Sequence, residues 1–423
     1  MSKMLIKSGR IIDPSSGADG IGDILIEDGH IAEIGDNLNY NVDNVINAKG
    51  LIVAPGLVDM HVHLREPGYT DKEDILSGCE AAAAGGITSM ASMPNTNPSV
   101  DSEKVIELIK NKAKNAKINV FPVAAITQGL NGNSLTCFEE LKRAGAIAFS
   151  DDGYPVSSAK LMLEAMVKAD SIAVPILAHC EDVSLTDGGI MNEGEISSML
   201  GVKGIPKASE NVGTAREIAI AMSTDTSVHI CHVSTAQCVE MIRNAKKNNI
   251  RVTAETCPHY FSLDDSLLSI KDADYRMSPP LRECEDRMAI INGIIDGTID
   301  AIATDHAPHT VEEKQSFEKA PNGTIGLETS LCAGITVLVN GGYISMCRLI
   351  ELMSTNPAKI LGVDAGTLKI GAPADIVIFS DNEKWRVDVN KLHGKSKNSA
   401  FKGIELTGKV KYTICSGKIV FKQ

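Results

Sequence analysis

The stretch LVDMHVHLRE, residues 57–66, begins like an apolar strand but carries two histidines, an arginine and carboxylates. Side chains two residues apart in a strand point to the same face, so His61 and His63 must project together. A lone HxH pair is also compatible with two histidines that are hydrogen-bonded in a core. The choice between a structural and a functional pair therefore depends on what the rest of the chain places beside it.

Eight short apolar runs, the first of which contains this stretch, alternate with segments of helical spacing. This alternation is typical of βαβ units and a parallel sheet, and eight is the number of strands that closes a barrel. The sequence therefore predicts an α/β fold, a (β/α)8 TIM barrel over residues 51–362. The runs are LIVAPGLVDMHVHL, GITSMASMP, INVFPVAAIT, AIAFSDD, VPILAHCED, SVHICHVST, IRVTAETCPHY and IDAIATDHAPH.

The two ends of the chain have a different pattern. Residues 1–50 and 363–423 consist of short alternating runs separated by Gly and Asp turns, which is typical of antiparallel strands. We expect these ends to pair with each other. They would form one small β-sandwich domain beside the barrel, with residues 1–50 and 363–423 as its two parts.

Composition excludes several classes of function. The net charge is −13, whereas nucleic acids and anionic membranes require a basic surface, so neither is an expected partner. The N-terminal residues lack the apolar core of a signal peptide, and we expect a cytoplasmic protein. The ten cysteines form no CxxC pair, which favours reduced thiols. Cys180, Cys231 and Cys257 lie in apolar runs near histidines, and buried packing is favoured there over a nucleophile.

Nearly every run ends in a group that can bind a metal. Active sites of α/β barrels lie at the C-terminal ends of the strands, where the loops converge. Imidazoles with one or two carboxylates suit zinc, and manganese, cobalt or iron less decisively. The pattern predicts a metal centre, with Asp305 as the candidate for moving protons. The groups are His61 and His63, Asp151 and Asp152, His179, His232, His259, and Asp305 with His306.

Nine ordered motifs resemble those of the amidohydrolase superfamily and, within it, a class I dihydroorotase. The resemblance extends over essentially the whole chain. It implies reversible cyclisation of N-carbamoyl-L-aspartate to dihydroorotate in pyrimidine biosynthesis. The motifs are VDMHVHLREPG, SMPNTNP, FSDDG, AHCED, CHVST, TCPHY, SPPLR, ATDHAPH and GTLKIGAPADIVIF.

The resemblance also implies a ligand set for one or two zinc ions. His61, His63 and Asp305 would hold one ion, and His179 with His232 a second. Several relatives bridge the two metals with a carboxylated lysine after the fourth strand, but this chain has AIAFSDDG there. Asp152 or a hydroxide would take that place, and Asp152 is preferred to its neighbour because its spacing to His179 resembles the bacterial class I pattern. A metal-bound hydroxide would attack the ring amide, with Asp305 as general acid and base.

Substrate contacts are expected from groups that recognise a small dianionic acid. Arg65 lies on the same face as His63 and can bind a carboxylate with a two-pronged contact, although a salt bridge at the rim is the plain alternative. Ordinary turn chemistry is the alternative for the other positions. Ser278 departs from the family pattern, which commonly has asparagine there. The full expected set is His63, Arg65, Asn95, Ser278, His309, Asn322 and Gly323.

Other expectations are less specific. His259 is expected to be structural or to support the ligands, and residues 309–326 to form either a surface loop or a substrate-covering lid. The resemblance implies a homodimer and an association with aspartate transcarbamoylase. The competing functions are an allantoinase or hydantoinase, a non-catalytic scaffold of aspartate transcarbamoylase, and a mononuclear deaminase. The last would need an HAGE-like motif, which the sequence lacks.

Overall fold

Eight parallel strands form a barrel, as the alternating sequence predicts. A computed structural model describes residues 3–423 of the chain. The strands hydrogen-bond in two parallel sheets, in the orders β6-β7-β8-β9 and β10-β13-β14-β15. Bridges from Phe149 to Ile176 and from Val62 to His306 join the two sheets and close the ring. The strands are β6 (Leu57–Val62), β7 (Ile87–Ser92), β8 (Asn119–Ala125), β9 (Ala148–Ser150), β10 (Leu177–Ala178), β13 (Val228–Ile230), β14 (Val252–Thr256) and β15 (Ala301–Ile302).

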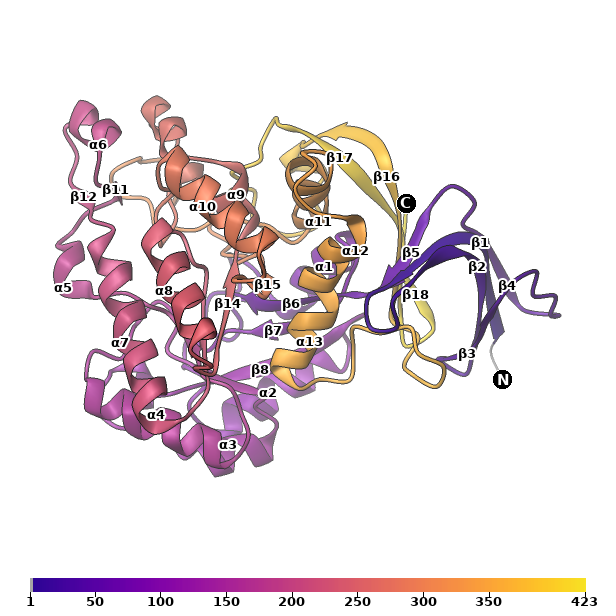
Figure 1. The fold of residues 1–423 in the computed structure, drawn as a ribbon, viewed down its shortest axis with the longest axis horizontal. Coiled ribbons are helices and arrows are strands. Elements are labelled where there is room, and N and C mark those ends of the chain that lie inside the picture. Colours follow the sequence, from indigo (N-terminus) through magenta and orange to yellow (C-terminus); the bar gives the residue numbers. More distant parts are fainter. Residues whose placement is uncertain (1–2) are drawn as a thin grey trace.

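Helices surround the ring because one side of each is apolar. In α8 (Ala236–Lys247), Val239 and Ile242 are buried, and Thr235 caps the first turn by accepting a hydrogen bond from the backbone N–H of Cys238. Such a cap stabilises a helix by about 1 kcal/mol. Figure 1 shows α4, α7 and α8 side by side on the outside of the barrel. The other main helices are α1 (Ile75–Ala84), α2 (Glu103–Ala113), α3 (Phe138–Ala144), α4 (Ala159–Ser171), α7 (Ala208–Thr224), α10 (Cys284–Ile295), α11 (Ser330–Gly334), α12 (Met346–Ile350) and α13 (Asn356–Leu361).

Several short elements complete the barrel. The π-helical turns η4 (Ile335–Val339) and η5 (Glu351–Thr355) directly continue α11 and α12. Between β10 and α7 the chain makes an excursion in which β11 pairs with β12. The remaining short elements are β11 (Met191–Asn192), β12 (Gly204–Ile205), α5 (Val183–Thr186), α6 (Glu195–Leu200), α9 (Pro258–Ser262), η1 (Gln128–Leu130), η2 (Asp265–Ile270), η3 (Ala273–Tyr275) and η6 (Val389–Lys391).

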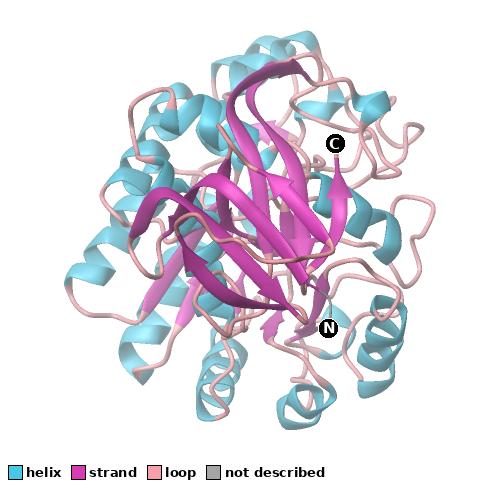
Figure 2. Cartoon of the chain, turned by 90° about the vertical axis from the view of Figure 1, so that its right-hand side faces the viewer, coloured by secondary structure: helices cyan, strands magenta, loops and turns pink. Residues whose placement is uncertain are grey.

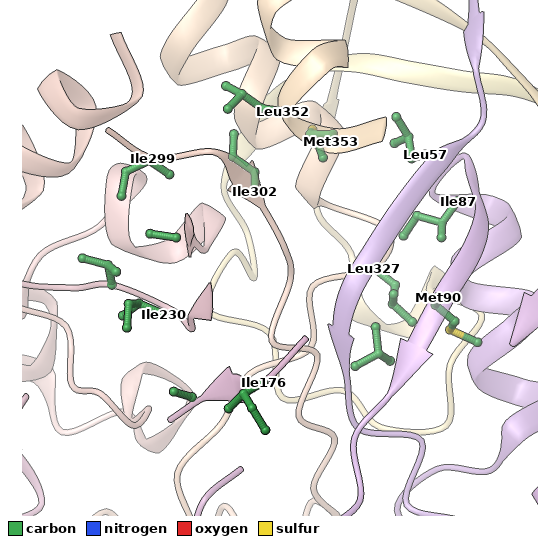
Figure 3. Close-up of a cluster of buried hydrophobic side chains, with 14 of the residues drawn as sticks. Leu57, Ile87, Met90, Ile176, Ile230, Ile299, Ile302, Leu327, Leu352 and Met353 are labelled. Atoms are coloured by element: carbon green, nitrogen blue, oxygen red, sulfur yellow. The ribbon is translucent and has the colours of Figure 1, made fainter. Parts of the chain in front are cut away.

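The apolar core between strands and helices decides which way the histidines face. Figure 3 shows part of this core, in which Leu57 and Ile87 of the strands and Leu352 of η5 are buried. Burying one such side chain stabilises the fold by about 1.5–3 kcal/mol. Val62 and Leu64 belong to the same cluster. Because side chains alternate along a strand, His61 and His63 point away from this cluster.

Strands from both ends of the chain form one eight-stranded sheet beside the barrel, in the order β18-β17-β16-β5-β1-β2-β3, with β4 also paired to β1. The two ends meet through β5, which lies within the range 51–362 predicted for the barrel: β5 pairs with β1 on one side and antiparallel with β16 on the other. A single residue, Gly56, separates β5 from β6. Residues 1 and 2 of the predicted first part lie outside the described residues. The strands are β1 (Lys3–Asp13), β2 (Ala18–Glu27), β3 (His30–Gly35), β4 (Asn44–Asn47), β5 (Ile52–Pro55), β16 (Ile376–Arg386), β17 (Glu405–Cys415) and β18 (Lys418–Lys422).

The cysteines and helices bear on two further expectations. All ten cysteines are free and seven are buried, among them Cys180, Cys231 and Cys257. Burial raises the pKa of these three thiols, which keeps them protonated and supports the packing interpretation. Within residues 3–423, no helix combines the length and the apolar character needed to cross a membrane.

Candidate active site

The C-terminal ends of the barrel strands bring the six predicted metal ligands together. Each of the six is at most 7% exposed. Two come from the first strand and four from the ends of other strands, so the cluster exists only in the closed barrel. The residues are His61 in β6, His63 just beyond it, Asp152 after β9, His179 after β10, His232 after β13 and Asp305 after β15.

The Asp152 carboxylate lies at the centre of the four imidazoles. Its Oδ1 is 3.3 Å from Nε2 of His61, 3.4 Å from Nδ1 of His179 and 3.3 Å from Nε2 of His232. Its Oδ2 is 3.3 Å from Nε2 of His63. Asp152 therefore links the first strand to the ligands on the opposite half of the barrel.

The neighbouring acid, Asp151, has a different task. Its Oδ1 accepts hydrogen bonds from the backbone N–H groups of Ile126 and Thr127, at 2.8 and 3.0 Å. These bonds attach the turn after β9 to the end of β8, and the next side chain, that of Asp152, then faces the histidines. The structure thus separates two acids that are adjacent in the sequence.

Asp305 completes the cluster on the side of the first strand. Its Oδ1 is 3.1 Å from Nε2 of His63 and 3.6 Å from Nε2 of His61. Asp305 and His232 have φ angles of 48° and 37°. Such left-handed backbone is uncommon for residues other than glycine, costs about 1–3 kcal/mol, and tends to occur at active sites.

The charges of the cluster favour a bound cation. Burial alone would raise the pKa of Asp305, but the hydrogen bond from His63 and the nearby His61 lower it to about 2. The pKa of Asp152 also lies well below its usual value, because His61, His179 and His232 outweigh its burial. In turn, the carboxylates outweigh burial and raise the pKa of His179 to about 10. The two carboxylates therefore stay ionised, and the positive charge beside them is supplied by protonated imidazoles or by a bound cation that takes the place of those protons.

The partners of the ring nitrogens that point away from the cluster decide which nitrogen faces it. His61 Nδ1 is 2.8 Å from Oε1 of Glu255, and His63 Nδ1 is 2.8 Å from Oδ1 of Asn95. Both oxygens can only accept, so each Nδ1 carries the hydrogen and each Nε2 offers a lone pair to the cluster. His179 has the opposite orientation, with Nδ1 toward Asp152 and Nε2 3.7 Å from Oε2 of Glu181.

Sequence reasoning missed Glu255. It is the penultimate residue of β14, is 1% exposed and has a pKa lowered to about 2, because hydrogen bonds from His229 and His61 outweigh its burial. The signal that could have found it is a carboxylate inside the apolar run IRVTAETC, where an ionised group needs a partner.

These residues fit a metal ion. Within residues 3–423, three candidate groups are fully buried, and in each the possible ligand atoms lie within 4.8 Å of one another. Two consist of predicted ligands, His61-Asp152-His232 and His61-His63-Asp305, and the third is His61-Cys231-Glu255. Nitrogen and carboxylate oxygen are the ligands that zinc and related ions take. In addition, Nε2 of His61 makes no hydrogen bond within the described residues, although it is buried.

Arg65 lies beside the cluster with its guanidinium partly free. Its Nε donates to the carbonyl of Pro308 at 3.1 Å, and Nη2 lies 3.4 Å from Nε2 of His309. Burial lowers the pKa of Arg65, while Asp305 opposes this shift. Arg65 and Asn95 line a cavity of about 590 Å³, whose wall also includes Lys72 and Tyr154.

His309 and Gly323 form one unit next to Arg65. His309 Nε2 donates to the carbonyl of Asn322 at 2.9 Å, and burial and the charge of Arg65 lower its pKa to about 3, so the imidazole is neutral. Gly323 has a φ of 136°, and a Cβ there would lie 2.6 Å from Cβ of Ala307 and 3.2 Å from Nε2 of His309. Only glycine lets this segment approach His309 so closely.

Two predicted positions are not joined to the cluster. Ser278 is half-buried and its side chain makes no hydrogen bond within residues 3–423. His259 is buried, and burial lowers its pKa to about 4, but it belongs to none of the potential metal groups of the described chain. The geometry of His259 agrees with the expectation that it is not a direct ligand.

The segment 309–326 is joined to the barrel by an ion pair and is bridged internally by a lysine. Lys72 forms an ion pair with Glu313 at 2.7 Å, and Lys314 Nζ donates to the carbonyls of Pro321 and Gly323, each at 3.0 Å. These contacts fix the segment in the position that the structure describes. They leave its role as a lid a prediction.

Comparisons with known proteins agree with this geometry. Residues 50–238 match the family described as dihydro-orotase-like, and residues 322–421 match the amidohydrolase family. The chain is 49% identical over 422 residues to a dihydroorotase of Acetivibrio thermocellus, covering 99% of both chains. It is 50% identical over 423 residues to one of Geotalea daltonii, again covering 99% of both.

Solved structures of similar fold include cyclic-amide hydrolases. One is the L-hydantoinase (dihydropyrimidinase) of Arthrobacter aurescens, with a TM-score of 0.90 and 26% identity, covering 100% of this chain and 96% of that one. Another is a D-hydantoinase, with a TM-score of 0.87 and 28% identity, covering 99% and 95%. The barrel and the attached sheet of terminal strands are therefore shared with these enzymes.

Proposed function

The chain belongs to the dihydroorotase family of the amidohydrolases, and from this membership we propose that it interconverts N-carbamoyl-L-aspartate and (S)-dihydroorotate. The observation that carries the proposal is the Asp152 cluster with Arg65 at its edge: a centre that fits a metal lies beside a cation that fits an acidic substrate. In the cell this reaction would serve pyrimidine biosynthesis.

The metal would be held by the clustered side chains, as zinc in one or two positions. His61, His63 and Asp305 would hold one ion, and His179 with His232 the other, with Asp152 between the two halves. A divalent ion there acidifies water and polarises a carbonyl oxygen. The amidohydrolase family is metal-dependent, whereas zinc and the number of ions are part of the proposal.

Asp305 would move the proton. In ring opening, it takes a proton from the attacking water and delivers it to the ring nitrogen, whose bond to the amide carbon breaks. His63 and His61 lower its pKa to about 2, so the carboxylate is ionised at the start of ring opening. In ring closure the protonated Asp305 gives its proton to one oxygen of the side-chain carboxylate, and the ureido nitrogen forms the bond to that carboxyl carbon. Asp305 then carries the proton that the nitrogen loses to the same oxygen, which departs as water.

Arg65 would bind the substrate carboxylate that does not react. Nη1 makes no hydrogen bond to the protein within residues 3–423, and Nη2 makes only the long contact to His309, so the guanidinium can offer two parallel N–H groups. Asn95, which also lines the cavity, and the neutral His309 would add further hydrogen bonds. The backbone of Asn322 and Gly323 would meet the ring. Ser278 would contribute less than the asparagine common in the family, because its shorter side chain offers one hydroxyl.

Arg65 also separates this function from its nearest competitor. A hydantoinase or allantoinase could share the barrel, the HxH pair and the terminal aspartate, but its substrate need not carry a ring carboxylate. This chain has no lysine after β9, where relatives of the hydantoinase type carry the bridging group. A non-catalytic scaffold, the third alternative, has no use for six converging buried ligands.

The setting of the enzyme completes the proposal. We expect it in the cytoplasm as a homodimer, with aspartate transcarbamoylase as a candidate partner. Its residues 1–50 and 363–423 would form one domain and residues 51–362 the other.

The deciding experiment follows the ultraviolet absorbance of dihydroorotate after it is added to the purified protein. A second sample is treated with a chelator, and a third is treated and then resupplied with zinc. Turnover that the chelator removes and zinc restores would support the proposal. Absent turnover in metal-replete protein would favour the scaffold, and opening of hydantoin or allantoin instead would favour the other cyclic amidases.

A further inference from the structure

His61, the first ligand of the centre, contacts a carboxylate that takes no part in the proposed reaction. His61 is fully buried, and its Nδ1 lies 2.8 Å from Oε1 of Glu255, on the side away from Asp152. Glu255 belongs to the inner part of strand β14, at 1% exposure, and does not line the substrate cavity. Its contacts are therefore with the protein and not with a substrate.

Two strands hold the Glu255 carboxylate in place. The backbone carbonyl of Glu255 accepts a hydrogen bond from the N–H of Val233 at 2.9 Å. The second carboxylate oxygen, Oε2, lies 3.5 Å from Nε2 of His229 on the neighbouring strand β13. His229 is itself fixed by a 2.8 Å contact between its Nδ1 and Oγ1 of Thr253, the residue opposite it in the register of the two strands. The result is a buried chain from Thr253 through His229 and Glu255 to His61.

The hydrogen-bond partner of His63 Nδ1 differs in kind from that of His61 Nδ1. Asn95 backs His63 with a neutral amide, follows β7 in a loop, is half-buried and lines the cavity. It can therefore serve both the imidazole and a substrate. Glu255 is charged and does not line the cavity, and among the described ligands of the centre its hydrogen-bond contact is with His61, on the side of the ring away from Asp152.

We propose that Glu255 is a positioning residue for the metal centre: it fixes His61 in the tautomer whose Nε2 faces the ion and increases the electron donation of that nitrogen. A carboxylate can only accept, so Nδ1 must carry the hydrogen. Partners of this kind behind a ligating histidine typically change metal affinity by about 10- to 100-fold. This inference rests on the proposed function, because it assumes that the cluster holds a metal.

The test compares Glu255→Gln with the wild type in the full chain, using Zn²⁺ alone as the probe. The glutamine keeps the size of the side chain, but its amide can present either an acceptor or a donor to His61, so the tautomer is no longer fixed. A chromogenic chelator competes for Zn²⁺ and gives the dissociation constant. We expect Glu255→Gln to raise that constant by about 10- to 100-fold.

Glu217→Gln is the matched control. Glu217 is a buried carboxylate in α7, at 1% exposure, and its ion pair is with Arg216, outside the centre. We expect Glu217→Gln to leave the Zn²⁺ dissociation constant within about twofold of the wild type. In the metal-free proteins, the midpoint temperature of thermal unfolding should fall no further for Glu255→Gln than for Glu217→Gln. A wild-type-like dissociation constant for Glu255→Gln would overturn the inference.

A second measurement needs only the wild type and so does not depend on whether the variant folds. Nitrogen NMR of the zinc-loaded protein, with the His61 signal assigned by its loss in His61→Asn, should show a hydrogen on Nδ1 and the metal on Nε2. The opposite arrangement would overturn the inference. Failure of the proposed function is distinguishable, because the wild type itself would then neither retain Zn²⁺ nor turn over dihydroorotate.

Discussion

Replacing Arg65 by methionine tests how the enzyme recognises an acidic ring. The change keeps a long apolar stem and removes the guanidinium. In the structure, Nε donates to the carbonyl of Pro308, while the N–H groups of Nη1 and Nη2 have no acceptor within the described residues, because Nε2 of His309, 3.4 Å from Nη2, itself donates to the carbonyl of Asn322. These two N–H groups are the ones that would meet the substrate carboxylate.

The expected loss follows from the number of those bonds. A hydrogen bond that involves charged groups contributes about 1.5–3 kcal/mol, so two contribute about 3–6 kcal/mol. At about 1.4 kcal/mol for each factor of ten, kcat/KM for dihydroorotate should fall by about 10² to 10⁴. The partial burial of Arg65 places the result toward the upper part of this range, because water competes less in a cavity.

The assay compares two substrates that differ only in the carboxylate. Ring opening of dihydroorotate and of dihydrouracil is followed with wild-type and Arg65→Met enzyme of equal metal content. The variant should lose kcat/KM for dihydroorotate and keep that for dihydrouracil within about threefold of the wild type. An equal loss for both substrates would refute the reasoning, because Arg65 would then act on the centre and not on the carboxylate.

Three further changes test other parts of the site. Asp305→Asn should lower turnover in both directions by at least about 100-fold, measured in metal-loaded protein; retained activity would remove Asp305 from the proton path. The pKa of His309 is lowered to about 3 against about 6.5 in an unfolded chain, so the unfolded state binds an extra proton between these values and the wild type loses stability as the pH falls from about 6.5 to about 3. Denaturant unfolding of His309→Asn should show a smaller loss over that interval, and an identical pH dependence would contradict the assignment of a neutral His309. Gly323→Ala places a Cβ 2.6 Å from Cβ of Ala307 at a φ of 136°, and should destabilise the protein by about 1–3 kcal/mol and raise KM by displacing His309. Gly342 has a φ of 74° and open space around it, so Gly342→Ala should lower the free energy of unfolding through backbone strain and leave KM unchanged. Similar KM values for the two variants would show that the close approach to His309 is unimportant.

The barrel could be predicted from sequence because its strands are local patterns. All eight apolar runs contain a barrel strand, even where, as in Leu177–Ala178, the strand has only two residues. The ligands were found for the same reason, since polar side chains at the ends of apolar runs stand out. What those ligands contact depends on neighbours that are distant in the chain, and a single sequence does not contain that information.

Glu255 and Asp151 show the two ways in which this limit appears. Glu255 lies 194 positions from His61 in the sequence, and nothing in either segment indicates that they touch. Asp151 and Asp152 are adjacent and chemically identical, and the backbone N–H groups of Ile126 and Thr127, with the hydroxyl of Thr127, hold Asp151 so that Asp152 turns inward. The π-helical turns η4 and η5 were missed because their period differs from that of an ordinary helix.

The pairing of β5 with β16 has a consequence for the order in which the protein is made. The strand that leads directly into the first metal ligands is synthesised early, but its antiparallel neighbour follows only after the 320 residues from 56 to 375. At about 5–20 residues per second, a ribosome needs about 16–64 s for that interval. During this time one edge of β5 has no partner and is open to incorrect strand pairing. The nascent chain therefore has to protect this edge until nearly the whole enzyme has emerged.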